Sequence, residues 1–295
     1  MTLSPALICC SSFLLFGQEL ASGQIIAYQT DSHIGVADLS GGKVVRRDLT
    51  PGTDPAISPD GKKIAFTQSD DAGDRRIAIA DVTTGAVTVV KGIPGKNEFM
   101  PVWSSDGKQL YFNHFLESEW ALASVDAEGG NFRLVLEKGS RQAGTFGPFP
   151  GGKEWLCHDL ESFFVLKLED QNKVTLADIA KTGTLSLSMP GHLDVSPDGK
   201  SALFERSVEE DVKPDDEGPP SAVFLIDLSS GKTKRLTPKG ANANCPAWLP
   251  GGKDYLFSGF DPESSSSTIC RAPLDGSTPP VILLKGASHP TVARP

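Results

Sequence analysis

The chain has 295 residues, of which 39% are hydrophobic, and it carries a formal net charge of −9. Binding to a phosphate backbone needs a basic stripe, so this acidic balance argues against nucleic acid as a partner. The hydrophobic share is sufficient for a buried core, and the length permits one large domain or two smaller ones.

The first element along the chain is an apolar run at residues 6–17, followed by small residues at 21–23. The run is too short to cross a membrane as a helix and has the length of a signal-peptide core. We predict that residues 1–23 are a signal peptide cleaved near Gly23, that the mature chain is periplasmic or otherwise exported, and that it keeps no transmembrane segment. Lipidation at Cys9 or Cys10 stays open, although Ile8 is not the small residue expected before a lipidated cysteine.

A short phrase then returns five times, at Ser58–Lys62, Ser104–Lys108, Phe149–Lys153, Ser196–Lys200 and Leu249–Lys253. The third residues of these copies are 46, 45, 47 and 53 positions apart. A period in this range is typical of a repeat array. Each copy has an apolar run on both sides, and Asp-Gly or Gly-Gly between two apolar runs predicts a β-hairpin because Gly adopts positive φ.

A second hairpin follows in each unit. Its first strand is predicted at Ile77–Ala80, Leu122–Val125, Phe164–Leu168, Val223–Asp227 and Ile269–Leu274. Its second strand is predicted at Val87–Val90, Phe132–Leu136, Lys173–Leu176, Thr233–Leu236 and Val281–Leu284. Four antiparallel strands in about 45 residues make one blade of a β-propeller.

The two ends of the chain complement each other. Ile25–Tyr28 reads like a second strand without a first, while Ser288–Val292 repeats the first-strand pattern and has no hairpin after it. We therefore predict an all-β fold, a six-bladed propeller of four-stranded antiparallel blades, closed by a C-terminal strand that completes the first blade. The predicted blades are one domain, 24–295, divided at about 24–51 with 287–295, 52–92, 98–138, 142–181, 189–238 and 242–285.

The repeat resembles the WD-like propeller repeat of the TolB family. It reads Pro-x-(aromatic or aliphatic)-Ser-Pro-Asp-Gly-Lys, and Asp54–Asp81, Met100–Asp126 and His192–Asp227 carry it best. The match weakens in the fourth blade, where Gly147-Pro148 replaces the usual Pro and Gly151 replaces Asp. TolB proteins also have a separate α/β domain before the propeller, for which we expect no room in this sequence.

The resemblance implies a non-catalytic scaffold that binds protein or peptide partners in the bacterial envelope. We expect a monomer, and whether the role of TolB in the Tol–Pal system applies stays open. Similar repeats also occur in the propellers that precede prolyl-oligopeptidase-type hydrolases, so the motif predicts the fold more strongly than the function.

The loops between second and third strands are predicted to lie on one face and to bind the partner, because loops on a rigid scaffold commonly carry binding residues. The basic residues of these loops are Arg75, Arg206 and Lys213, and carboxylates far outnumber them. The loops therefore either attract a basic surface or keep the protein soluble. The insert Ser207–Pro220 is predicted to be a mobile acidic flap. The candidate partner-binding residues are Asp70, Asp71, His114, Glu117, Trp120, His158, Glu209, Glu210, Asp215, Asp216 and Asp261.

Alignment of the blades predicts a second candidate site at the mouth of the central channel. The residues that begin the six innermost strands are Asp54, Met100, Thr145, His192, Cys245 and His289. Imidazole, thiolate and carboxylate are ligands of Zn²⁺, so His192, Cys245, His289 and Asp54 are candidates for zinc or another divalent cation. The alternative is that these side chains only pack or hydrate the channel entrance.

Enzyme signatures are missing from the sequence, which contains neither Gly-x-Ser-x-Gly nor His-Glu-x-x-His. We therefore expect no catalytic residues and no cofactor. The alternative is a metal-dependent hydrolase or lyase with its site at the channel mouth. Trp103 and Trp248 share one repeat position and are predicted to pack between blades, and Cys157, Cys245 and Cys270 are predicted to be free buried thiols.

Overall fold

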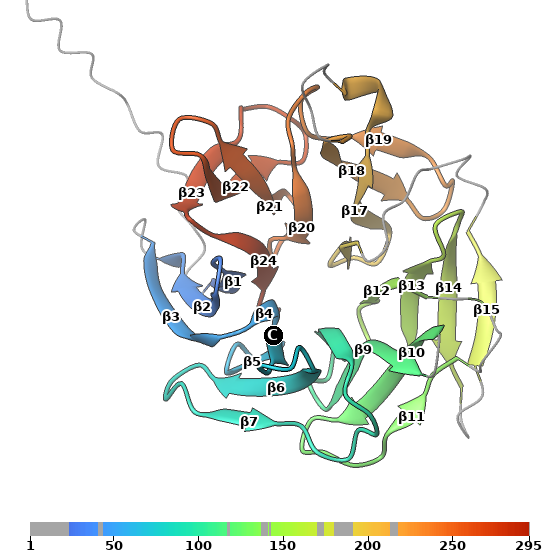
Figure 1. Cartoon of the computed structure of the whole chain (residues 1–295). Coiled ribbons are helices and arrows are strands. Elements are labelled where there is room, and N and C mark those ends of the chain that lie inside the picture. Colours follow the sequence, from blue (N-terminus) through green and yellow to red (C-terminus); the bar gives the residue numbers. More distant parts are fainter. Residues whose placement is uncertain are drawn as a thin grey trace, which may run out of the picture.

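A computed structural model describes residues 24–40, 44–116, 119–136, 141, 143–169, 174–179, 191–212 and 218–294. The predicted signal peptide lies outside these ranges. The strands form six four-stranded antiparallel sheets that surround a central axis, as Figure 1 shows. The predicted six-bladed propeller is thus confirmed.

Each blade is named here by its strands from the axis outward. Blade 1 has β24 (Ser288–Val292), β1 (Ile25–Gln29), β2 (His33–Asp38) and β3 (Val45–Pro51), and blade 2 has β4 (Thr53–Ile57), β5 (Lys63–Ser69), β6 (Arg75–Asp81) and β7 (Val87–Val89). Blade 3 has β8 (Glu98–Trp103), β9 (Gln109–Leu116), β10 (Glu119–Asp126) and β11 (Arg133–Leu134), and blade 4 has β12 (Thr145–Pro148), β13 (Glu154–His158), β14 (Phe163–Leu168) and β15 (Val174–Asp178). Blade 5 has β16 (Leu193–Val195), β17 (Ser201–Ser207), β18 (Ser221–Asp227) and β19 (Thr233–Arg235), and blade 6 has β20 (Asn244–Trp248), β21 (Asp254–Asp261), β22 (Ser266–Pro273) and β23 (Val281–Lys285).

Closure of the ring depends on the last strand. β24 pairs antiparallel with β1, with Ala27 opposite Thr291 and Ile26 opposite Val292. The backbone N–H of Ala293 extends this ladder by donating to the carbonyl of Ile25. Figure 1 shows β24 beside β1, at the inner side of blade 1. The last strand thus covers the inner edge of β1 and completes the first blade, as the sequence pattern predicts.

The repeated Ser-Pro-Asp-Gly-Lys phrase forms the first hairpin turn of blades 2, 3 and 5. In blade 2 the Ser58 hydroxyl donates to Asp60 Oδ1 at 2.7 Å, and the same carboxylate accepts the N–H of Lys62. Gly61 has a φ of 72°, which favours glycine. The equivalent bonds recur at Ser104 with Asp106 and at Ser196 with Asp198. These local bonds explain why the phrase marks the blades so reliably.

The core lies between neighbouring blades. Trp103 is buried on β8, and its indole N–H donates to the carbonyl of Ala56 on β4 at 2.8 Å. Trp248 on β20 makes the equivalent bond to the carbonyl of Asp194, at 3.0 Å. Both predicted inter-blade tryptophans are confirmed. Cys157, Cys245 and Cys270 are free and buried, also as predicted.

Among the residues that the structure describes, no helix is long and apolar enough to cross a membrane.

Candidate functional site

The inner strands begin with an irregular residue at the same structural position in four blades. Asp54, Met100, Cys245 and His289 have φ values of 53°, 54°, 49° and 51°, and a proline follows each of them. Positive φ is uncommon for residues other than glycine, and a following proline normally restricts its neighbour to extended conformations. Such residues cost about 1–3 kcal/mol each and persist only where the surroundings enforce them.

The enforcing contact comes from one repeat position on the second strand of the preceding blade. The backbone N–H of Asp54 donates to Gln29 Oε1 at 2.9 Å, and that of Met100 donates to Thr67 Oγ1 at 3.1 Å. In the same way the N–H of His289 donates to Ser258 Oγ. These acceptors belong to a ring of six polar side chains at one repeat position: Gln29, Thr67, Asn113, His158, Glu205 and Ser258.

Glu205 is the only carboxylate in this ring. Its Oε2 accepts the backbone N–H of Cys245, so it holds the inner strand of blade 6 as its counterparts hold other blades. We did not expect this residue from the sequence. The available signal was this one repeat position on the second strand, which is polar in every blade and a carboxylate only in blade 5.

The inner strands surround a cavity of about 480 Å³ that runs along the axis. Asp54, Met100, Thr145 and His192 line it, so four of the six predicted channel-mouth residues face this space. Cys245 and His289 do not line the cavity, although the prolines that follow them do. The other lining residues include Pro55, Pro101, Pro148, Ala247, Val102 and Val195. The cavity is thus walled mainly by rigid apolar groups, with a few polar side chains at its mouth.

An ion pair crosses the channel at the opposite ends of these strands. The guanidinium of Arg294, just after β24, contacts the carboxylate of Asp194 on β16 and donates to the carbonyl of Val195. The same carboxylate accepts the backbone N–H of Trp248. The C-terminal residues therefore tie blade 1 to blade 5 across blade 6.

Blades 5, 6 and 1 bring His192, Cys245 and His289 together at the mouth. Their possible ligand atoms, one from each residue, lie within 4.8 Å of one another. The two imidazole rings meet edge to face, with centroids 5.2 Å apart. His192 Nδ1 lies 4.0 Å from Glu205 Oε1, and the Glu205 side chain is only 10% exposed.

The charges of this cluster stabilise one another. Burial lowers the pKa of His192, but the neighbouring Cys245 and Glu205 outweigh burial and raise that pKa well above its usual value. Burial raises the pKa of Cys245, yet His192 and His289 outweigh it and lower the pKa of the thiol. The pKa of Glu205 is also lowered, because His192 and the N–H of Cys245 offset its burial. Each of these three pKa shifts is therefore toward the charged form of its group.

Asp54, the fourth predicted ligand, does not join this cluster. Its carboxylate turns toward its own blade, where Oδ2 accepts the Thr67 hydroxyl at 2.7 Å. Within the described part of the chain, the group of possible metal ligands contains His192, Cys245 and His289 alone.

Comparisons with known proteins agree with the architecture. No protein-family model matches the chain. The structure aligns with TolB from Acinetobacter baumannii at a TM-score of 0.69 and 20% identity, over 92% of this chain and 66% of that one. It aligns with a putative TolB from Agrobacterium tumefaciens at a TM-score of 0.63 and 16% identity, over 89% and 88% of the two chains. The chain has the fold of a TolB-like β-propeller.

A curated relative extends the likeness to a peptidase. The chain is 27% identical to dipeptidyl-peptidase 5 of Porphyromonas gingivalis over 133 residues, which cover 42% of this chain and 19% of that protein. The chain thus spans less than two thirds of both this relative and the Acinetobacter TolB. At these identities the likeness concerns the fold.

On this TolB-like propeller, four of the predicted partner-binding residues are exposed. Asp70 and Asp71 lie in the loop between β5 and β6, where Asp70 Oδ1 also accepts the N–H groups of Ala72 and Asp74. Glu209 and Glu210 lie in the insert after β17, and Glu210 contacts Arg206 at 3.2 Å. The predicted residues Glu117, Asp215 and Asp216 lie outside the described residues.

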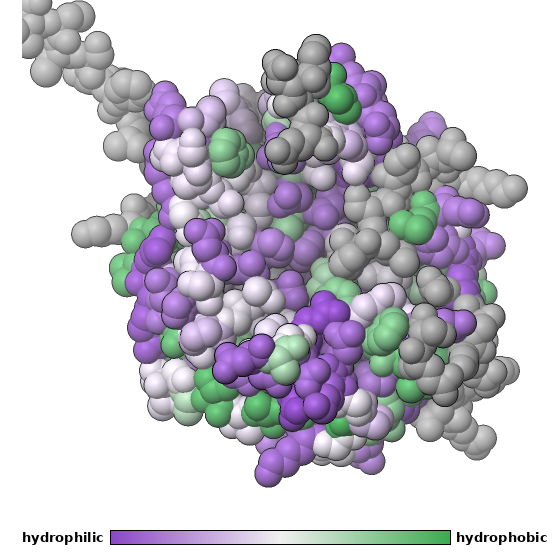
Figure 2. Space-filling view, in the orientation of Figure 1, coloured by the Kyte–Doolittle hydropathy of each residue, from purple (hydrophilic) through white to green (hydrophobic). Residues whose placement is uncertain are grey.

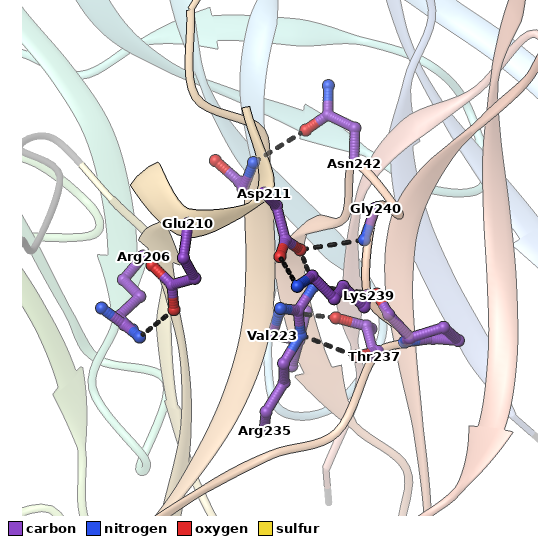
Figure 3. Close-up of polar contacts among 11 residues, drawn as sticks. Arg206, Glu210, Asp211, Val223, Arg235, Thr237, Lys239, Gly240 and Asn242 are labelled. Atoms are coloured by element: carbon purple, nitrogen blue, oxygen red, sulfur yellow. Dashed lines mark hydrogen bonds and ion pairs between the residues drawn. The ribbon is translucent and has the colours of Figure 1, made fainter. Parts of the chain in front are cut away.

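The described start of the insert is anchored, as Figure 3 shows around Asp211. Residues Glu209–Asp211 form a short 3₁₀ turn, and the buried Asp211 carboxylate accepts Arg235 at 2.7 Å and the N–H of Gly240 at 2.9 Å. Over 208–212 the prediction of a mobile flap is therefore wrong. The local composition did not reveal the long-range ion pair between Asp211 and Arg235 that anchors this part of the insert.

The remaining four predicted partner-binding residues are wholly or partly buried. His114 lies 3.3 Å from Glu98 in a buried pair on β9 and β8, and His158 is buried at the end of β13. Asp261 is buried and accepts Lys285 Nζ at 2.7 Å. Trp120 is half-buried between Phe99 and Phe115, with ring centroids 4.8 Å from each. In this conformation His114, His158 and Asp261 are therefore covered, whereas Trp120 keeps part of its surface exposed.

Basic residues from the inter-blade connections neutralise part of the acidic face. Lys96 pairs with Asp74 at 2.8 Å, and Arg141 contacts Asp159. Figure 2 shows hydrophilic residues interspersed with small apolar patches over one face of the molecule. The exposed negative charge of the loops is therefore smaller than their composition alone suggests.

Proposed function

We propose that this TolB-like propeller is a non-catalytic scaffold that binds an extended segment of a partner protein at the mouth of its central channel. The cavity of about 480 Å³ carries this proposal. Many of its lining residues are prolines, which are rigid, so binding of a segment costs the propeller little conformational freedom. Polar groups at the mouth supply orientation, as in other mostly apolar binding sites.

The exposed carboxylates of Asp70, Asp71 and Glu209 give the partner a preferred charge. They lie in loops between second and third strands, the same kind of loop that surrounds the channel mouth. A basic segment would therefore be attracted toward the mouth at low ionic strength, with the attraction screened over about 10 Å at 0.1 M salt.

The proposed compartment is the bacterial envelope. The predicted signal peptide at 1–23 and the likeness to TolB structures support export to the periplasm. We further propose that the mature chain acts as a monomer. The proposal concerns partner binding and leaves the identity of the partner to experiment.

Photo-crosslinking tests this function. A photoreactive amino acid replaces Met100, which lines the cavity and is half-buried, and in a control chain it replaces Val45, which is 65% exposed on the outer strand β3. In intact cells we expect a defined crosslinked protein from position 100 and none from position 45. The same product from both positions, or no product from position 100, would show that the channel mouth is not the binding site.

A charge variant separates the loops from the channel. Replacing Asp70 and Asp71 with Asn should weaken capture of the crosslinked partner at low salt and have less effect at high salt, because exposed charges act mainly through screened attraction. An equal effect at both salt concentrations would argue against steering by these loops.

A further inference from the structure

Two imidazoles and one thiol from three different blades converge at the channel mouth. Their ligand atoms lie within 4.8 Å of one another. In a tetrahedral site with bonds of about 2.0–2.3 Å, ligand atoms lie roughly 3.3–3.8 Å apart. Side-chain rotation that moves each atom by about 1 Å or less would therefore bring the three to the spacing of a metal site.

The backbone holds two of these residues firmly. Cys245 and His289 occupy the positive-φ position before proline, and the side chains of Glu205 and Ser258 fix their N–H groups. Asp54 and Met100 share this backbone conformation without joining a ligand cluster. The conformation is thus a property of the inner strands, and the chemistry belongs to the side chains that blades 5, 6 and 1 place there.

The Nδ1 contacts of the two rings suit coordination through Nε2. His289 Nδ1 lies 3.0 Å from Ser288 Oγ, and His192 Nδ1 lies 4.0 Å from Glu205 Oε1. Metal-bound histidines generally use their second nitrogen in this way, with a carboxylate or hydroxyl that orients the ring. In each ring Nε2 is then the nitrogen left for a metal ion.

The other blades provide an internal comparison. Their inner strands begin with Asp54, Met100 and Thr145, and the side chains Gln29, Thr67 and Asn113 of the polar ring carry no charge. The blade that supplies His192 is also the blade with a carboxylate, Glu205, in the ring. A thiolate and a carboxylate together offset the charge of one divalent cation, so these side chains match a metal in both ligand type and charge.

We propose that His192, Cys245 and His289 bind one Zn²⁺-class ion, with the nearby Glu205 carboxylate positioning His192. A thiolate with two imidazoles selects zinc or a similar transition metal over Mg²⁺ and Ca²⁺, which prefer oxygen ligands. Because His192 lines the cavity, a fourth coordination position open to that space would accept an anionic or nitrogen donor of an incoming ligand. This inference goes beyond the scaffold function, which needs no metal.

Metal reconstitution of the full chain tests the proposal. The protein is stripped with a chelator, incubated with Zn²⁺ or Co²⁺ and freed of unbound ions, and its metal content is measured by mass spectrometry. We expect one ion per chain, and in the cobalt form a thiolate-to-metal charge-transfer band. Cys245→Ser should lose that band, whereas Cys270→Ser, another buried free thiol in the same blade, should keep it.

Zinc titration of single variants measures how much each side chain contributes to metal binding. His289→Asn should bind Zn²⁺ more than about 100-fold more weakly, while the control His33→Asn should bind like the parent chain. Glu205→Gln should weaken binding about 10–100-fold, the usual effect of losing a residue that orients a ligand. Thermal melting shows which variants fold. His289→Asn changes a half-buried side chain, so it still tests the metal site if Cys245→Ser does not fold.

Three results would overturn the assignment. They are a parent chain without stoichiometric zinc, a cobalt form without the thiolate band, and unchanged affinity in His289→Asn. Partner crosslinking at Met100 in the presence of a chelator tests the scaffold function separately, so failure of the metal site and failure of partner binding are distinguishable.

Discussion

One side chain of the polar ring on the second strands, Glu205, has two tasks. Gln29, Thr67 and Ser258 each accept one backbone N–H from the next blade, and neutral acceptors are sufficient for that bond. Glu205 makes the same bond and also faces His192. A neutral glutamine would keep the first task and lose the charge, so Glu205→Gln separates the structural role from the electrostatic one.

His158 occupies the polar-ring position in blade 4, and its burial predicts how stability depends on pH. Its side chain is 2% exposed, its ring lies against Phe163, and no hydrogen-bond partner for its Nδ1 lies within the described residues. Burial lowers its pKa to about 4, although the charges of Asp159 and Glu205 oppose that shift. The folded state therefore favours the neutral form of His158.

The sign of the resulting pH dependence follows from linkage. In the unfolded chain His158 takes up a proton below a pH of about 6.5, whereas in the folded chain it does so only near pH 4. His158 therefore favours folding above pH 6.5, and this contribution is lost as the pH falls. We expect it to remove about 2–3 kcal/mol of stability between pH 7 and 4.5. Urea unfolding of His158→Gln should therefore show a shallower pH dependence than the parent chain. A slope equal to that of a His33→Gln control would contradict the assignment.

At the scale of elements, the close approach of β12 and β16 explains where the repeat departs from its pattern. Gly147 on β12 directly follows the position that is proline in blades 1, 2, 3 and 6. A Cβ built on Gly147 would lie 2.9 Å from the backbone carbonyl oxygen of Leu193. That oxygen belongs to β16, directly after His192. Glycine therefore permits the two inner strands to pack closely, and the sequence anomaly is a packing requirement.

Gly147→Ala should force these strands apart. We expect a loss of about 1–3 kcal/mol, the usual cost of overpacking, and a displacement of His192 that weakens metal binding. Gly218→Ala is the matched control, because a Cβ there meets no atom within 4 Å. Urea unfolding and zinc titration of both variants provide the test. Equal behaviour of the two would show that blades 4 and 5 adjust without strain.

The same scale shows which features the sequence predicts well. Hairpins follow from local chemistry, since Ser58, Asp60 and Gly61 form their turn with bonds among themselves. The convergence of His192 with Cys245 depends on the curvature of three blades, and only the repeat alignment indicated it. Contacts such as Asp211 with Arg235, or Asp54 with Thr67, join residues whose positions no local pattern specifies. Because such ion pairs neutralise several loop carboxylates, the negative charge predicted for the loop face is larger than the structure shows.

At the scale of the whole molecule, the ring depends on β24, because this strand alone joins the two ends of the chain. It pairs with β1 and buries Ala287 and Val292 against blades 6 and 1. Its removal would expose the inner edge of β1, where Ile26 and Tyr28 are fully buried. It would also remove His289 and the Arg294 contact with blade 5.

Deleting residues 287–295 should therefore abolish cooperative unfolding. Exposure of two or three large apolar side chains costs about 1.5–3 kcal/mol each, and the lost backbone ladder adds to this, whereas the whole domain is stable by only about 5–15 kcal/mol. Urea unfolding followed by tryptophan fluorescence and circular dichroism should show a broad transition for the truncated chain. A synthetic peptide of residues 287–295 added in excess should restore part of the cooperativity by pairing with β1. A truncated chain with the midpoint and slope of the parent would mean that the ring is held closed by contacts other than β24.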